Sequence, residues 1–320
     1  MSSKNSMAPS TERGGKVADH GGICPAAVPV VAIEAETGLS KEVIRKWEVR
    51  YGFPSPDRDE NGDRLYPAEQ VLQIQLIRRL LGAGMRPSKV VGLDLESLER
   101  LAADVSPAKE AHPSGFSLQV LDTLVAHDLG HLTHLLRGQK NRQGLSLFVR
   151  DTLARLNTVV GDAWLRGDIQ VFEEHLYTEA VIDVLHEAVR TVTASSGFPR
   201  VLLSTAPGEL HTIGLLMASA VLTLEGACCI RLGPQTPQTE IVAAVKACRI
   251  DAVGLSFSIA HPVRDSANFL RDLRRRLDPG VHIWAGGRGV ARLRRIPGVR
   301  FIGDLDEIGP AIRALTAGKA

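Results

Sequence analysis

The amino-acid sequence predicts a multidomain chain with three folded parts: a winged helix-turn-helix, a bundle of about four helices, and a doubly wound (Rossmann-like) α/β domain. Two stretches with little apolar patterning, 1–28 and 104–115, indicate a disordered arm and a linker. Apolar residues recur at helical spacing over 116–198, with breaks at 137–144 and 166–168, which predicts the bundle. Over 199–320 short apolar runs alternate with helical patterns, which is typical of parallel βαβ units.

Composition limits the classes of protein that this chain can be. A net charge of +2 over 320 residues means that any basic surface must be local. No segment approaches the ~20 apolar residues of a membrane span, and the N-terminus lacks the apolar core of a signal peptide. We therefore expect a cytoplasmic protein whose four cysteines are reduced.

The first folded part, 29–103, carries the pattern of a DNA-binding head. Gly38 separates two short helical patterns, and Ser40 is a good N-cap for the second, which carries Lys41 and Arg45. The run "DRDENGDRLYP" predicts a hairpin that turns near Asn61-Gly62, a wing whose Arg58 and Arg64 can reach phosphates. The alternative is a small helical domain with a solvated charged face.

The last part, 199–320, is expected to hold a ligand at one edge of its sheet. The predicted strands are 200–206, 228–233, 252–258, 282–287 and 299–303. Ligands of such sheets bind outside the carboxyl ends of the strands. The run "APGELHTIG" leaves the first strand at that edge and carries Glu209 and His211.

These two residues suit a metal site, because a metal-binding imidazole usually has its other nitrogen held by a carboxylate. Gly214 opens the following helix, where a bulky ligand can approach the backbone. Small residues at two further strand ends favour a deep slot for a long tail; they are Ser256, Ser258, Gly286 and Gly287. The alternatives are an incidental loop histidine and close packing of helix on sheet.

A second group of histidines lies in "HDLGHLTH". His127, His131 and His134 fall on roughly one face of a helix, and imidazoles at i, i+4 spacing can bind zinc. A solvated or partly packed helix face is the alternative, since no carboxylate or cysteine partner is evident.

The segment "RKWEVRYGFPSPDRDENGDRLYP" closely resembles the MerR family of transcription regulators, over residues 29–95. The resemblance implies a winged helix-turn-helix that binds double-stranded operator DNA as a dimer or larger assembly. The residues that it implies as DNA contacts or as braces of the helix–wing junction are Ser40, Lys41, Arg45, Trp47, Arg64 and Tyr66.

Residues 116–316 resemble a cobalamin-binding module. The resemblance implies that His211 is the lower axial ligand of cobalt and that the slot receives the displaced tail of the cofactor. The run "WLRGDIQVFEEH" is similar to the motif by which cobalamin-dependent regulators cap the cofactor's upper face, and it places Trp164, Glu174 and His175 there. Trp164 and Glu174 would contact the 5′-deoxyadenosyl group; a bundle-core aromatic is the alternative for Trp164.

A MerR head, a capping bundle and a cobalamin module in this order resemble the CarH/LitR group of photoreceptor repressors. This resemblance implies a non-enzymatic regulator that carries adenosylcobalamin and binds DNA as a homo-oligomer, which light disassembles. Two positions depart from the pattern, Glu209 in place of Asp and Leu165 in place of a histidine that ligates cobalt after photolysis. The alternatives are a regulator that senses another tetrapyrrole, one without a light switch, and a corrinoid methyltransferase-like protein.

Overall fold

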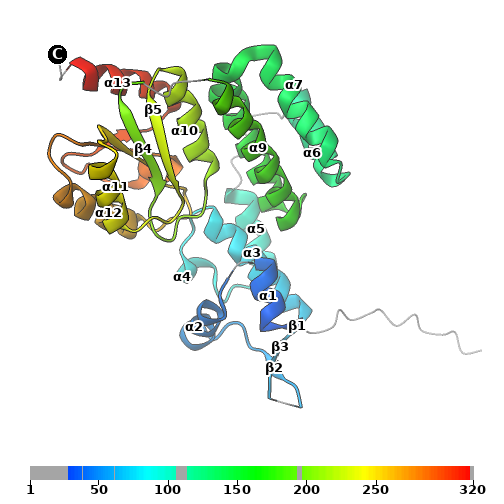
Figure 1. Ribbon diagram of the computed structural model, residues 1–320. Coiled ribbons are helices and arrows are strands. Elements are labelled where there is room, and N and C mark those ends of the chain that lie inside the picture. The colour runs from blue at the N-terminus through cyan, green and yellow to red at the C-terminus, as the bar shows by residue number, and fades with distance from the viewer. Residues whose placement is uncertain (1–27, 38, 61, 106–113, 193–196, 318–320) are drawn as a thin grey trace, which may run out of the picture.

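The computed structural model describes residues 28–317 apart from 38, 61, 106–113 and 193–196. The expected disordered arm, save Val28, and most of the expected linker lie outside the described residues. Figure 1 shows three parts, with the head (28–105) below the bundle (115–191) and the sheet domain (199–317) beside the bundle.

The head contains the predicted helix-turn-helix and wing. Ser40 caps the second helix, where its hydroxyl accepts a hydrogen bond from the Val43 amide, and Gly52 ends it with a left-handed φ of 69°. The strands form an antiparallel sheet in the order β1-β3-β2. The elements are β1 (Val28–Pro29), α1 (Val30–Thr37), α2 (Lys41–Tyr51), β2 (Asp57–Arg58), β3 (Arg64–Tyr66), α3 (Ala68–Gly82), α4 (Pro87–Val90) and α5 (Leu95–Val105).

The bundle has the predicted four helices, and both expected breaks are found. Within the polar stretch 137–144 the break lies at the last residue, Gly144, where φ is 81° and ψ is 158° and α7 is kinked between two helical segments. Residues 137–143 are helical, because Arg, Gln and Lys are good helix formers. The break at Gly167 is confirmed, since its φ of 83° ends α8. The elements are α6 (Gly115–Val125), α7 (Leu129–Leu147), the π-helical turn η1 (Phe148–Leu153), α8 (Ala154–Arg166) and α9 (Val171–Thr191).

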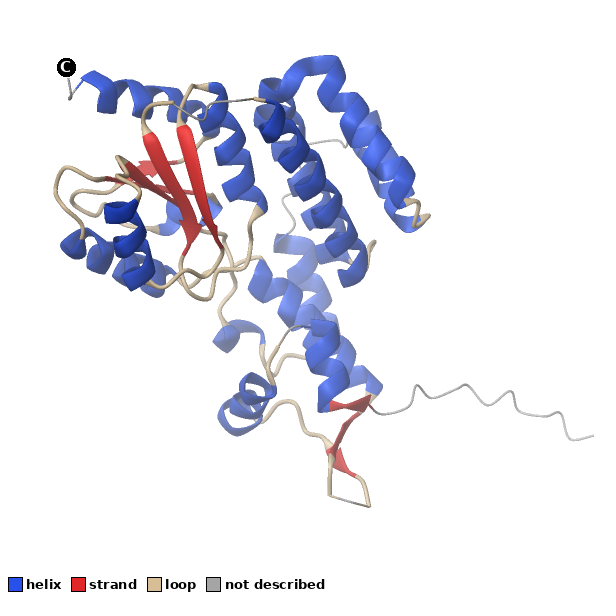
Figure 2. Ribbon diagram, viewed as in Figure 1, coloured by secondary structure: helices blue, strands red, loops and turns tan. Residues whose placement is uncertain are grey.

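The sheet domain is doubly wound, as predicted, with five parallel strands in the order β5-β4-β6-β7-β8 (Figure 2). The order reverses between β4 and β6, and in such sheets a ligand crevice opens at the carboxyl ends of these two strands. The strands are β4 (Arg200–Thr205), β5 (Cys228–Gly233), β6 (Ala252–Ser256), β7 (His282–Gly286) and β8 (Arg300–Ile302). The helices are α10 (Ile213–Leu224), α11 (Gln238–Ala247), α12 (Val263–Arg276) and α13 (Ile308–Ala317), with short turns η2 (Arg288–Arg292) and η3 (Leu305–Glu307).

Helix α10 lies between the sheet and the bundle helix α9 (Figure 1). One hydrophobic core runs without interruption from the bundle through α10 to one face of the sheet, and α13 also contributes to it. A second core lies under α11 and α12 on the other face. Bundle and sheet domain are therefore one packed unit, joined through α10 over one face of the sheet. Among the described residues, no helix has the length and apolar character needed to cross a membrane.

Candidate functional site

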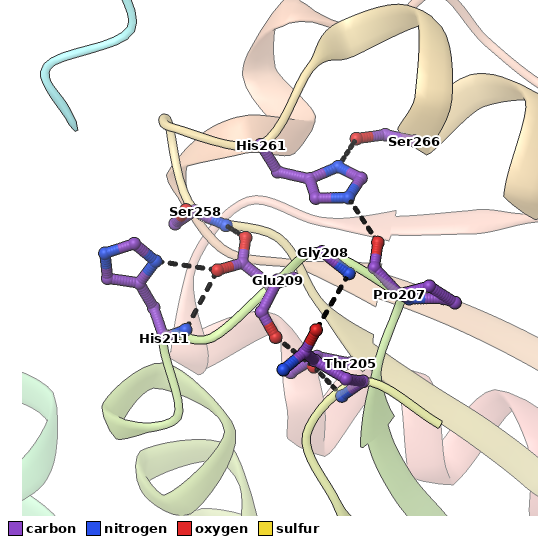
Figure 3. Close-up of polar contacts among 9 residues, drawn as sticks. Thr205, Pro207, Gly208, Glu209, His211, Ser258, His261 and Ser266 are labelled. Atoms are coloured by element: carbon purple, nitrogen blue, oxygen red, sulfur yellow. Dashed lines mark hydrogen bonds and ion pairs between the residues drawn. The ribbon is translucent and has the colours of Figure 1, made fainter. Parts of the chain in front are cut away.

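The loop that follows β4 (206–212, here the ligand loop) is organised around the Glu209 carboxylate (Figure 3). Its Oε1 accepts hydrogen bonds from the His211 amide at 2.9 Å and from the His211 ring Nδ1 at 2.7 Å. Its Oε2 accepts one from the Ser258 amide at 2.7 Å. Since Ser258 follows β6, this carboxylate joins the ends of the two strands that flank the switch point.

Glu209 is held as a carboxylate although it is only 1 % exposed. Burial by itself raises the pKa of this carboxyl, but the hydrogen bonds from His211 and Ser258 outweigh it and lower the pKa to about 2. A permanent negative charge therefore faces the His211 ring. This charge favours the tautomer that carries its proton on Nδ1.

His211 is left with one ring nitrogen available. Nδ1 is occupied by Glu209, so Nε2 carries the lone pair that can bind a metal ion. The His211 side chain is 57 % exposed, which leaves it accessible to a large ligand. Leu210 is 65 % exposed although apolar, and a flat apolar ligand at this edge would cover it. The arrangement is that of an oriented, open axial ligand.

Two further anchors of the ligand loop were not predicted from the sequence. Thr205 donates its hydroxyl hydrogen to the Glu209 carbonyl at 2.7 Å. The buried His261 ring contacts the Pro207 carbonyl through Nε2 at 3.2 Å and the Ser266 hydroxyl through Nδ1 at 2.6 Å (Figure 3). Their partners are 4 to 54 residues away in the chain, and no short motif marks them. A histidine near the carboxyl end of the third strand was the one available signal.

The small residues at the strand ends serve two different purposes. A Cβ on Gly214 would lie 3.1 Å from the Ser256 hydroxyl, so glycine lets the first turn of α10 approach the end of β6. A Cβ on Gly287 would lie 2.4 Å from the Phe257 carbonyl oxygen, and its φ is 91°. At Gly287 the close-packing alternative therefore holds. At Gly286 a Cβ would make only an ordinary contact.

The bundle presents the cap motif (Trp164, Glu174 and His175) from the end of α8 and the start of α9. Trp164 is partly buried, Glu174 hydrogen-bonds Thr178, and His175 is 71 % exposed with Nδ1 on the Val171 carbonyl. On the same helix as Trp164, burial raises the pKa of Asp162, while the charges of Arg166 and Arg288 oppose that rise. Arg288 belongs to the sheet domain, just after Gly287, so charges of the bundle face charges of the carboxyl edge.

Leu165, where the family resemblance implies a metal-binding histidine, is 7 % exposed in the bundle.

The possible zinc site at His127, His131 and His134 finds no support, because no group of three metal-binding side chains occurs in the described part of the chain. His127 lies in the turn before α7 and binds Glu173 at 2.9 Å, and His131 and His134 are exposed.

In the head, α2 presents an exposed basic surface. Lys41 and Arg45 are exposed, while Trp47 on the same helix is buried with α3 and α5 in the head's core. The amphipathic helix therefore has one side for packing and one for a polyanion.

The helix–wing junction is a hydrogen-bonded triad. The Glu48 carboxylate accepts hydrogen bonds from the Tyr66 hydroxyl at 2.8 Å and from Arg64 Nε at 3.3 Å. Burial and the adjacent Glu48 raise the pKa of Tyr66, so its hydroxyl stays protonated. Tyr66 and Arg64 of β3 therefore both tie the wing to α2 through Glu48.

The residues at the carboxyl edge fit a corrinoid on three observations. Nε2 of His211 is available to cobalt. The Ser258 hydroxyl and the Trp164 indole N–H are buried without any hydrogen-bond partner. Buried polar groups normally find partners, so two orphaned ones on residues expected to contact the cofactor indicate a missing polar ligand.

Comparisons with known proteins agree with these features. Residues 29–94 match the MerR HTH family of regulatory proteins, and residues 199–304 match the B12 binding domain. The chain is 30 % identical over 267 residues to the HTH-type transcriptional repressor CarH of Myxococcus xanthus, covering 80 % of this chain and 88 % of that protein. It is 26 % identical over 254 residues to the repressor CarA of the same organism, covering 79 % and 84 %.

Among solved structures, the monomethylamine corrinoid protein of Methanosarcina barkeri is similar with a TM-score of 0.49 at 16 % identity, covering 62 % of this chain and 96 % of that one. The similarity to CarH spans head, bundle and sheet domain. The chain therefore belongs to the family of cobalamin-binding HTH-type transcriptional regulators that includes CarH, in which a MerR-type head is joined to a B12 binding domain.

Proposed function

We propose that this protein is a repressor that binds operator DNA as a homo-oligomer while it carries adenosylcobalamin, and that light ends this state. The single observation that carries the proposal is the oriented His211, held by Glu209 at the switch point of a B12 binding domain. The repressor names of both relatives support a regulatory and not a catalytic role.

The ligand loop would hold cobalt from below. His211 would offer Nε2 to the metal, and Glu209 would keep the ring oriented and electron-rich. The Ser258 hydroxyl would donate to a polar group of the cofactor, because it has no partner within the protein. Gly214 and Ser256, which pack closely against each other, would border the path of the cofactor's tail beside the loop.

The cap motif would cover the upper ligand. The Trp164 ring and the Glu174 carboxylate would pack against the adenosyl group, and the unpartnered indole N–H would find an acceptor there. Adenosylcobalamin supplies a cobalt–carbon bond that light breaks. Leu165 has no donor atom and cannot replace the lost ligand, so we propose that light acts by removing the contacts of Trp164 and Glu174.

The head would read the operator through α2 and the wing. Lys41 and Arg45 are exposed on α2, and Ser40 lies at its N-terminus, where backbone amides favour phosphate. Arg64 would exchange its Glu48 partner in part for a DNA phosphate. One small winged head covers too little DNA for specific binding, which supports a dimer or tetramer.

The test is the absorption spectrum and cobalamin affinity of His211→Ala against wild type in the dark. We expect the variant to lose the histidine-on spectrum and to bind adenosylcobalamin far more weakly. His282→Ala is the matched control, since His282 is exposed at the opposite, amino end of β7. Unchanged spectra and affinity in His211→Ala would remove the proposal, and an operator shift assay with and without cofactor tests its second half.

A further inference from the structure

The C-terminal end of α3 in the head contacts the bundle's cap motif. A Cβ built on Gly82, the last residue of α3, would lie 3.2 Å from ring carbons Cη2 and Cζ3 of Trp164. Arg79, one turn earlier, is 8 % exposed, and its Nη1 lies 2.8 Å from the Cβ position of Gly167, just past α8. The absence of side chains at Gly82 and Gly167 therefore allows the head to pack closely against the end of α8.

Arg78 acts on the other half of the motif through its charge. Its Nε donates to the Thr37 carbonyl at 3.1 Å, which anchors it within the head. Burial lowers the pKa of Arg78, and the Glu174 carboxylate opposes that change, so the two charges act on each other across the boundary between head and bundle. Trp164 thus packs against α3, and Glu174 acts electrostatically on Arg78 of α3.

The turn after α3 reaches the sheet domain as well. A Cβ on Gly84, whose φ is 87°, would lie 2.8 Å from the Ile259 side chain and 2.6 Å from Arg292 Nη1. Arg292 in turn donates to the Ile259 carbonyl at 3.0 Å. Ile259 directly follows Ser258, whose amide binds Glu209. Within three residues, the head therefore touches both the cap above the cofactor site and the carboxyl edge below it.

We propose that the docked head positions Trp164 over the upper ligand, so that docking of the head and binding of adenosylcobalamin strengthen each other. The inference rests on the proposed function and adds how the two sites are coupled. Helix α3 is the element through which the state of the cofactor site affects the DNA-binding head. Because packed interiors do not deform continuously, displacing α3 from Trp164 must shift the indole ring. By thermodynamic reciprocity, a cofactor that fixes Trp164 then favours the docked head by the same factor.

The test enlarges Gly82 in the full-length chain. Gly82 has ordinary helical geometry, and alanine favours a helix over glycine, so Gly82→Ala leaves α3 intact. We expect the dissociation constant for adenosylcobalamin to rise about 3-fold in Gly82→Ala and about 10-fold or more in Gly82→Leu, within the usual range of coupling between sites. Hydroxocobalamin lacks the adenosyl group that Trp164 would cover, so its affinity should change by less than about 2-fold.

Gly161→Ala is the matched control, since Gly161 lies on the same helix as Trp164 and a Cβ there would meet nothing within 4 Å. Equal loss of both cobalamins in Gly82→Leu would indicate general damage and overturn the coupling, as would unchanged adenosylcobalamin affinity. Either result leaves the proposed function standing if His211→Ala still abolishes binding. If wild type binds no cobalamin at all, both proposals fall.

A second measurement tests the same coupling through operator affinity. The ratio of operator affinities with and without adenosylcobalamin should be smaller in Gly82→Leu than in wild type, by about the factor found for cofactor binding. An identical ratio in the two proteins would refute the role of α3.

Discussion

Replacing Glu209 by glutamine tests the centre of the site with the smallest possible change in shape. The carboxylate accepts three hydrogen bonds, two on Oε1 from His211 and one on Oε2 from Ser258. A glutamine can keep the acceptor at one position only. At the other position its NH2 group faces an N–H donor, so at least one buried bond becomes a donor–donor contact.

The magnitude follows from the pKa of Glu209, which the fold lowers from its ordinary 4.5 to about 2. Each pKa unit corresponds to about 1.4 kcal/mol, so the ionised carboxylate stabilises the folded protein by about 3 kcal/mol at neutral pH. Because the folded pKa is the lower one, this stabilisation is complete above about pH 5. It is lost as the pH falls from 4.5 towards 2, with about 1.4 kcal/mol left at pH 3.

The assay is urea unfolding of the cofactor-free protein at pH 7 and at pH 3 to 4, in wild type and in Glu209→Gln. We expect the variant to be less stable by about 3 kcal/mol at pH 7. The gap should narrow in acid because only wild type has a carboxyl at position 209 that becomes protonated there. Glu240→Gln, at an exposed position in the first turn of α11, should change either value by less than about 1 kcal/mol, the usual contribution of an acid at a helix N-terminus.

The same variant should bind cobalamin about 10–100-fold more weakly, which is the usual effect of losing a group that orients a metal ligand. A stability loss below about 1 kcal/mol at pH 7, or a gap that does not narrow in acid, would refute the argument that three hydrogen bonds hold this carboxylate ionised.

Further predictions concern other parts of the molecule. His261→Ala should weaken cobalamin binding but leave unchanged the absorption spectrum that His211 ligation gives to bound cofactor. His261→Asn should restore part of the affinity, since an amide can still donate a hydrogen bond to the Pro207 carbonyl. Equal affinities in wild type and both variants would exclude a positioning role for His261. Arg45→Ala should weaken operator binding. It should also lower the slope of operator affinity against salt concentration by about the amount expected for one phosphate contact, measured by titration at several ionic strengths. Leu165→His should enlarge the light-induced loss of oligomer seen by size measurement, at a cost of about 1–3 kcal/mol in stability because the site is buried; an unchanged light response would show that another residue ligates cobalt.

Local chemistry in the sequence was sufficient to predict most of the architecture. Gly52 and Gly167 end helices in left-handed geometry, and the strand runs of the sheet domain appear where their apolar residues predict them. The pair Glu209 and His211 was predictable because both ends of that hydrogen bond lie in one short motif.

The remaining features depend on contacts between distant segments. The hydrogen bond from His261 to Pro207 and the approach of Gly82 to Trp164 join residues that are 54 and 82 positions apart, and no periodicity encodes such pairs. Gly287 was expected to line a slot, but its position against the Phe257 backbone is set by how two loops meet after β6 and β7. The break expected over 137–144 is confined to Gly144, because the polar residues before it are good helix formers and continue α7.

The uninterrupted core through α10 constrains how this molecule can move. A bundle that shares its core with the sheet domain cannot open by a hinge motion, because that motion would expose buried side chains of α9 and α10 to water. The permitted motion is shear, in which helices slide by an ångström or so over surfaces that stay covered. Amide hydrogen exchange should therefore remain slow in α9 and α10 with and without cofactor, while the end of α8 and the turn after α3 exchange at different rates in the two states.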